Sequence, residues 1–113
     1  GLTALHSACN LGHLDVVTCL LQADHINVNF QHEYGPTPLH LACRGRKVEV
    51  VRYLLQDERI DINAEDETGG TPFRKACAMG CSIMATCFLQ HMHDNNISID
   101  LLALYENGVL HVA

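Results

Sequence analysis

Apolar residues recur at helical spacing in pairs of short segments. In the first pair, Leu5, Ala8 and Cys9 lie three and four residues apart, which is the spacing of one helix face. Paired aliphatic residues then predict a second helix over 14–21, and Gly12 stands between the two segments, where it is expected to end the first helix. The pattern therefore predicts two short helices joined by a tight turn.

A stretch of alternating apolar and polar residues follows the second helix in each of the first two units. One polar residue separates Ile26 from Val28, and one separates Ile60 from Ile62. Alternation with a period of two is typical of an extended strand. We therefore expect each stretch to belong to a β-hairpin finger that connects one helix pair to the next.

The whole unit repeats every 34 residues. The segments that open successive units read GLTALHSAC (1–9), GPTPLHLAC (35–43) and GGTPFRKAC (69–77). Second helices are expected near 48–55 and 82–92 in the same register. Such a period predicts stacked units, each burying its apolar face against the next. The predicted boundaries are 1–34, 35–68, 69–105 with three additional residues, and 106–113 as the start of a truncated fourth unit.

Equivalent apolar positions are expected to form continuous buried rows through the stack. One row holds Leu5, Leu39, Phe73 and Leu110, a second holds Leu20, Leu54 and Phe88, and small alanines at 8, 42, 76 and 113 let neighbouring helices approach closely. The predicted core therefore runs along the whole array instead of closing around one centre.

A threonine precedes each first helix, at the position expected for an N-cap. Thr37 and Thr71 are each followed by proline, which is favoured at the first helical position. His6 and His40 occupy the third helical position, where a neutral imidazole can bond to the capping threonine. Arg74 replaces this histidine in the third unit and cannot accept such a bond, so we expect that unit to be less stable.

Two motifs carry a resemblance to a known family. Residues 35–42 read GPTPLHLA and residues 12–17 read GHLDVV, which resemble the G-x-T-P-L-H-x-A and G-H-x-E-V-V stretches of ankyrin repeats. The resemblance covers essentially the whole chain and implies an all-α ankyrin-repeat solenoid of stacked helix-turn-helix units with β-hairpin fingers. It also implies the capping role of His6 and His40. Arg46 departs from the family pattern, because it replaces the turn glycine.

Composition and charge narrow the classes of partner. The 113 residues contain 7 Lys and Arg against 13 Asp and Glu, a formal net charge of −6. Nucleic-acid binding depends mainly on clustered positive charge, so no nucleic-acid partner is expected. No apolar run approaches the ~20 residues needed to span a bilayer, so direct membrane insertion is not expected either.

Six cysteines raise the question of disulfides or a metal. Cys9, Cys43 and Cys77 share one helical position in successive units, where packed helices lie ~8–10 Å apart, whereas a disulfide needs Cα atoms within about 7 Å. We expect these thiols to be reduced, which favours an intracellular protein, cytoplasmic or nuclear. A zinc site is a remote alternative in the third unit, although the spacing there is not that of a standard finger. Its candidate ligands are Cys77, Cys81, Cys87, His91 and His93.

Enzymatic chemistry finds little support in the sequence. The serines at positions 7, 82 and 98 have no catalytic motif around them, and no glycine-rich phosphate loop is present. Gly69 and Gly70 belong to the turn before the third first helix. We therefore expect no catalytic residues, no cofactor and no enzyme activity.

The resemblance implies a concave face, formed by the fingers and the first helices, that binds partner proteins. Tyr34 and Arg44 are of residue types that dominate interface hot spots. Acidic residues at 65–67 oppose basic residues at 44, 46, 74 and 75, a division that favours oriented docking of a mixed-charge segment. The candidate partner-binding residues are Asn10, Leu11, Glu33, Tyr34, Pro36, Arg44, Arg46, Glu67, Thr68, Lys75, Ala78 and Met79.

The expected function is that of a protein–protein interaction module, as a scaffold or adaptor segment of a longer polypeptide. The alternative is an intramolecular regulatory domain that docks on a larger enzyme or channel in the same chain. Arrays of this kind normally end in units with a polar outer face, whereas apolar residues stand in both terminal units. The open ends therefore allow end-to-end self-association of the isolated chain.

Overall fold

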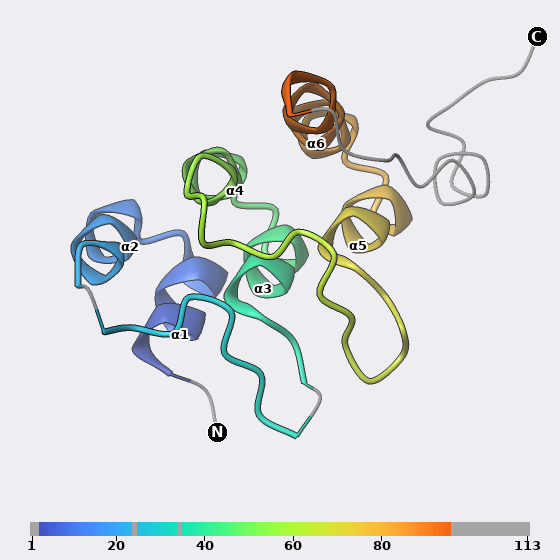
Figure 1. Ribbon diagram of the computed structural model, residues 1–113. Coiled ribbons are helices and arrows are strands. Elements are labelled where there is room, and N and C mark those ends of the chain that lie inside the picture. Colours follow the sequence, from blue (N-terminus) through green and yellow to red (C-terminus); the bar gives the residue numbers. More distant parts are fainter. Residues whose placement is uncertain (1–2, 24, 34, 96–113) are drawn as a thin grey trace, which may run out of the picture.

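The computed structural model describes residues 3–23, 25–33 and 35–95, and these residues form six helices (Figure 1). The helices are α1 (Ala4–Leu11), α2 (Leu14–Leu21), α3 (Pro38–Arg44), α4 (Val48–Leu55), α5 (Pro72–Ala78) and α6 (Ser82–Asp94). The predicted bounds of α2 and α4 are confirmed, whereas α6 continues to Asp94, beyond the predicted end near residue 92. The predicted fourth unit lies outside the described residues.

The helices form two layers that repeat along one direction. The first helices, α1, α3 and α5, lie side by side in one layer, and α2, α4 and α6 form the other (Figure 1). Each first helix packs on the second helix of its own pair, and α3 packs on both α1 and α5. The helix pairs therefore repeat as the 34-residue period predicts, and the fold is all-α.

Reciprocal hydrogen bonds cap the first two of these pairs. In α3, the Thr37 side chain accepts from the His40 amide (3.2 Å), and the ring Nδ1 of His40 lies 3.1 Å from the Thr37 amide nitrogen. His6 and Thr3 make the same capping box at α1. At α5, Thr71 accepts from the Arg74 amide (3.2 Å), but arginine cannot return a bond as an acceptor. The predicted threonine N-caps are confirmed. At α5 the reciprocal bond of the capping box is lost, because Arg74 stands in place of the histidine.

The turn between the helices of each pair requires a left-handed backbone. Gly12 and Gly80 adopt φ values of 76° and 68° there, and Arg46 adopts 57° at the equivalent position. A residue with a Cβ pays about 1–2 kcal/mol for this conformation. The second unit therefore keeps the turn in spite of an unfavourable residue.

The buried rows follow the predicted register with one exception. Leu39 and Phe73 are each only 1% exposed, and Leu54 and Phe88 are fully buried. Leu20, expected in the same row as Leu54, is only half-buried, because no described helix packs on the side of α2 away from α4. The alanines at 8, 42 and 76 are buried as predicted, whereas Leu110 and Ala113 lie outside the described residues.

The fingers differ from the expected β-hairpins, since the described residues contain no strand. Short polar side chains bond to the backbone two residues ahead: Asn27 accepts from the Asn29 amide (3.1 Å) and Asp61 from the Asn63 amide (3.0 Å). Such local bonds compete with strand pairing. The apolar alternation instead reflects burial of Val28 and Ile62 beneath the helices.

Side chains also tie successive fingers together. Asn29 donates to the carbonyl oxygen of Arg59 (2.7 Å) and accepts from the Asp61 amide (2.8 Å). Farther along, Gln31 donates to the carbonyl oxygens of Glu65 (2.7 Å) and Gly35 (3.0 Å). These bonds fix the spacing of the fingers and so hold the partner-binding candidates on them in place.

Candidate partner-binding surface

The outward face of the first helices carries several of the predicted partner-binding residues. Asn10, Arg44 and Ala78 occupy equivalent positions on α1, α3 and α5, and all three are exposed. Three residues earlier on the same helix face, Lys75 is half-buried. Because Asn10, Arg44 and Ala78 are exposed, their side chains can contact another molecule.

The carboxyl ends of the first helices form one border of this face. Leu11 ends α1 with 57% of its surface exposed, so it adds an apolar side chain to this border. Arg46 donates from Nη2 to the carbonyl oxygen of Met79 (3.0 Å), so these two predicted residues meet. A Cβ at Gly45 would lie 2.5 Å from the carbonyl oxygen of Asn10, so glycine permits this close approach of α3 to α1.

The fingers form the opposite border. Glu33 is exposed, has a φ of 49°, and lies 3.8 Å from the His32 ring nitrogen. Glu67 and Thr68 are exposed in the second finger, and Thr68 donates to the Asp66 carboxylate (2.6 Å). The Asp66 carboxylate is therefore bonded within its own loop. The exposed negative charge of this finger comes instead from the glutamates on either side of Asp66 in the sequence.

The two borders are separated by the length of a first helix. Seven residues, as in α3, span about 10 Å. The structure therefore brings the predicted residues together in two groups, one on the fingers and one at the helix ends. Tyr34 lies outside the described residues. Pro36 is half-buried and contributes its carbonyl oxygen to a bond from His6 Nε2 (3.0 Å), so its backbone serves the fold.

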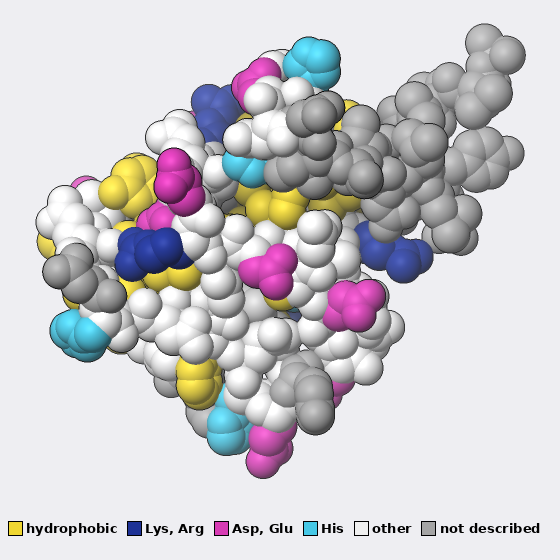
Figure 2. Space-filling view, viewed as in Figure 1, with side chains coloured by type: hydrophobic (Ala, Val, Ile, Leu, Met, Phe, Trp, Pro, Cys, Tyr) yellow, Lys and Arg dark blue, Asp and Glu magenta, His cyan; other side chains and the backbone are white. Residues whose placement is uncertain are grey.

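The exposed charged residues fall into the same two groups, with acidic residues on the fingers and basic residues at the helix ends. The exposed acids of the fingers, Glu33, Glu65 and Glu67, stand opposite Arg44 and Arg46 at the helix ends. Figure 2 shows acidic side chains spread over the fingers in the lower half of the view. A bound segment would therefore meet negative charge at one side of the face and positive charge at the other.

A comparison with protein-family models finds one match. The model described as "Ankyrin repeats (3 copies)" matches residues 1–66, which is more than half of the chain. The chain belongs to the ankyrin-repeat family. The match ends before α5, although α5 and α6 repeat the arrangement of the preceding ankyrin helix pairs. A comparison with curated proteins finds no match.

Two histidines inside the ankyrin array are fixed by three bonds each. His40 Nε2 lies 2.8 Å from the Gly70 carbonyl oxygen, so this nitrogen carries the proton and Nδ1 accepts from Thr37. Burial lowers the pKa of His40 and of His6 below 6.5, although bonds to the carbonyl oxygens of Gly70 and Pro36 oppose the shift. Both rings are structural links between successive units.

The cysteines of the repeat position are buried thiols. Cys9, Cys43 and Cys77 are at most 1% exposed, and Cys9 and Cys43 are free thiols. Burial raises the pKa of Cys9 to about 12, and it also raises the pKa of Cys43. Thiols of this kind react poorly, since the thiolate is the reactive form.

The zinc alternative finds no geometric support in the part of the chain that the structure describes. No three His, Cys, Asp or Glu side chains there come close enough to hold a metal ion. Cys77 is buried in the core, His93 is exposed on α6, and Cys87 bonds to Arg52 instead. The five candidate ligands therefore do not converge.

Among the described residues, none of the helices has both the length and the apolar character that a membrane-spanning helix requires.

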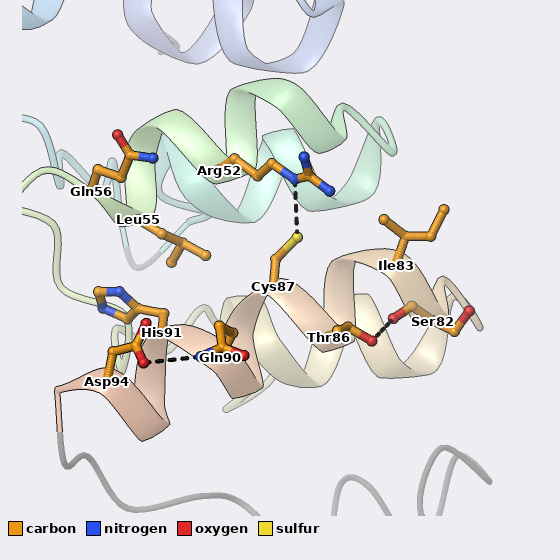
Figure 3. Close-up of a pocket in the computed structure, with 10 residues that line it drawn as sticks. All are labelled: Arg52, Leu55, Gln56, Ser82, Ile83, Thr86, Cys87, Gln90, His91 and Asp94. Atoms are coloured by element: carbon orange, nitrogen blue, oxygen red, sulfur yellow. Dashed lines mark hydrogen bonds between the residues drawn. The ribbon is translucent and has the colours of Figure 1, made fainter.

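A groove between α4 and α6 was missed by the sequence analysis. It has a volume of about 530 Å³. The two helices that line it, α4 and α6, belong to the second-helix layer, on the side away from the fingers (Figure 1). Leu55 from α4 and Ile83 from α6 line it, and Arg52 reaches across to Cys87 (Figure 3). The available signal was a break in the repeat: Tyr53 of α4 corresponds to the much smaller Cys87 of α6, 34 residues later.

Proposed function

We propose that this ankyrin array binds a partner polypeptide on the face formed by the fingers and the first helices. Ankyrin repeats are generally protein–protein interaction modules, and ankyrin-repeat domains are typically non-enzymatic. We choose this face because it carries an exposed row of equivalent residues, Asn10, Arg44 and Ala78, and because the apolar Leu11 lies beside that row. Arginine is one of the residue types that are enriched at the energetic centres of interfaces, which makes Arg44 the main candidate on this face.

The division of charge supports one orientation of the bound segment. An acidic part of the partner would lie against Arg44 and Arg46, and a basic part would lie against Glu33 and Glu67. Opposed charges steer association and fix register more than they add affinity. The expected partner segment is therefore bipolar, with an apolar side chain that reaches Leu11.

Capture from a cell extract, quantified by mass spectrometry, tests the choice of face. The variant Leu11→Ser with Arg44→Ala removes the apolar anchor and the adjacent cation. The matched control, Val16→Ser with Glu49→Ala, removes an exposed aliphatic side chain and a charge from α2 and α4. We expect the control to retain the captured proteins and the face variant to lose them. Equal capture by both variants would refute the proposed face.

We also propose that the array works in a reducing, intracellular compartment, cytoplasmic or nuclear. The buried, unpaired thiols of Cys9 and Cys43 support this, because disulfides are rare in such compartments. Imaging of a fluorescent fusion of the parent polypeptide would test the location. Accumulation of the fusion in the secretory pathway would contradict it.

A further inference from the structure

The groove between α4 and α6 exists because one repeat position changes size. Positions 19, 53 and 87 are equivalent in the three second helices, and they hold Cys19, Tyr53 and Cys87. Cys87 faces α4, since its sulfur accepts a bond from Arg52 Nε (3.4 Å). Tyr53 is half-buried and packs on the core, and the repeat relation implies that it faces α2 as Cys87 faces α4.

The α4–α6 interface therefore lacks a ring that the preceding interface supplies from within the chain. Cys87 fills only the start of the space, and a groove of about 530 Å³ remains above it. This volume falls within the ~300–1,000 Å³ typical of small-molecule sites. Leu55 forms a buried apolar wall, and Ile83, 56% exposed, forms an open apolar rim.

The groove is lined by one cation and one carboxylate, Arg52 and Asp94, and the cation suits an aromatic ring. Arg52 reaches from α4 toward Cys87 on α6 (Figure 3), and its side chain keeps 54% of its surface exposed. Its nearest carboxylate oxygen, on Glu49, is 3.8 Å away, which is a loose contact. A guanidinium attracts the negative face of an aromatic ring, and this attraction complements the apolar wall.

We propose that the α4–α6 groove binds a tyrosine or phenylalanine side chain presented by a partner polypeptide. The ring takes the place that Tyr53 holds at the α2–α4 interface, against Leu55 and beneath the Arg52 guanidinium. This second surface lies on the layer opposite the fingers and is independent of the proposed partner-binding face. One partner can therefore occupy the groove while another occupies the fingers.

The test uses p-cresol, the side-chain analogue of tyrosine, titrated into ¹⁵N-labelled protein under reducing conditions. We expect saturable amide shifts confined to residues 52–56 and 82–94. The saturated counterpart, 4-methylcyclohexanol, has the same substituents but no π face, and Arg52→Gln removes the cation. Each change should weaken binding by about two- to fivefold, the factor expected for an exposed cation–π contact.

Substitution at the key position gives the decisive comparison. Cys87→Tyr supplies the missing ring from within, so we expect a folded protein in which the p-cresol shifts are lost. Cys19→Tyr, at the equivalent exposed position of α2, is the matched control and should retain them. Cys87→Ala leaves the groove open and should also bind, which excludes a reaction of the thiol. Absence of saturable shifts in the wild type, or shifts unchanged by Cys87→Tyr, would overturn the proposal.

Discussion

Acidification is expected to destabilise the array through the two buried histidines. In the neutral ring of His40, Nε2 donates to the Gly70 carbonyl oxygen and Nδ1 accepts from Thr37. Protonation turns Nδ1 into a donor that faces the Thr37 amide, so the capping box is lost. His6 makes the same contacts with Thr3 and Pro36.

The sign and size of the effect follow from burial. The folded state lowers the pKa of both imidazoles below the ordinary 6.5, chiefly by desolvation, so the unfolded chain binds more protons below that pH. Stability is therefore complete above about pH 6.5 and falls as the pH decreases. The slope is at most about 1.4 kcal/mol per pH unit for each histidine, or about 2.8 kcal/mol per pH unit for both. Over one pH unit, this loss is a large share of a typical free energy of unfolding of about 5–15 kcal/mol.

Urea denaturation followed by circular dichroism at pH 7.5, 6.5 and 5.5 measures this slope. Asp57 does not obscure it, because hydrogen bonds from Arg59 hold the pKa of Asp57 below 3.8, outside this pH range. We expect His40→Gln to reduce the slope by about half, whereas His93→Gln, on the exposed side of α6, leaves it unchanged. A wild type equally stable at pH 7.5 and 5.5, or a His40→Gln slope equal to that of the wild type, would refute the reasoning.

Three further predictions concern the stack and its turns. Leu54→Ala should lower the free energy of unfolding by about 2–5 kcal/mol, and the half-buried Leu20→Ala by less, as measured by urea denaturation. Gly80→Ala should cost about 1–2 kcal/mol through its φ of 68° alone, because no neighbour lies within 4 Å of the new Cβ, and a neutral result would contradict this. A thiol reagent should modify Cys19 at once but reach Cys43 only on unfolding, and rapid native labelling of Cys43 would show that the core opens.

Much of the fold could be predicted because repetition multiplies weak local signals. A single threonine before a helix is a modest indication, but Thr3, Thr37 and Thr71 recur at 34-residue spacing and all three cap. The repeat also predicts which first-helix residues are exposed, since equivalent positions such as Asn10 and Arg44 have the same exposed environment. The position of a residue within the repeat thus predicts its position in the fold.

The fingers were predicted less well, because alternation has two physical causes. Strand pairing and one-sided burial both place apolar residues at every second position. Here Val28 and Ile62 are buried under the helices, while Asn27 and Asp61 bond to nearby amides and make turns. The sequence pattern alone does not distinguish these causes.

The groove could not be predicted from residues that are present, since it results from a missing side chain. Its cause is visible only when Cys87 is compared with Tyr53 in the same register. The volume also depends on how closely α4 and α6 approach, which is set by packing along the entire stack. A break in a repeat is thus a useful signal for surfaces that the repeat itself does not explain.

The central claim, that a partner lies on the first-helix face, is tested most directly by photo-crosslinking. The photoreactive residue p-benzoylphenylalanine is placed either at Leu11 on α1 or at Val16 on α2, two apolar positions that are 57% and 45% exposed in the same unit. Illumination in cell extract is expected to yield a partner adduct from position 11 and none from position 16. Adducts from position 16 alone, or in equal yield from both, would contradict the claim.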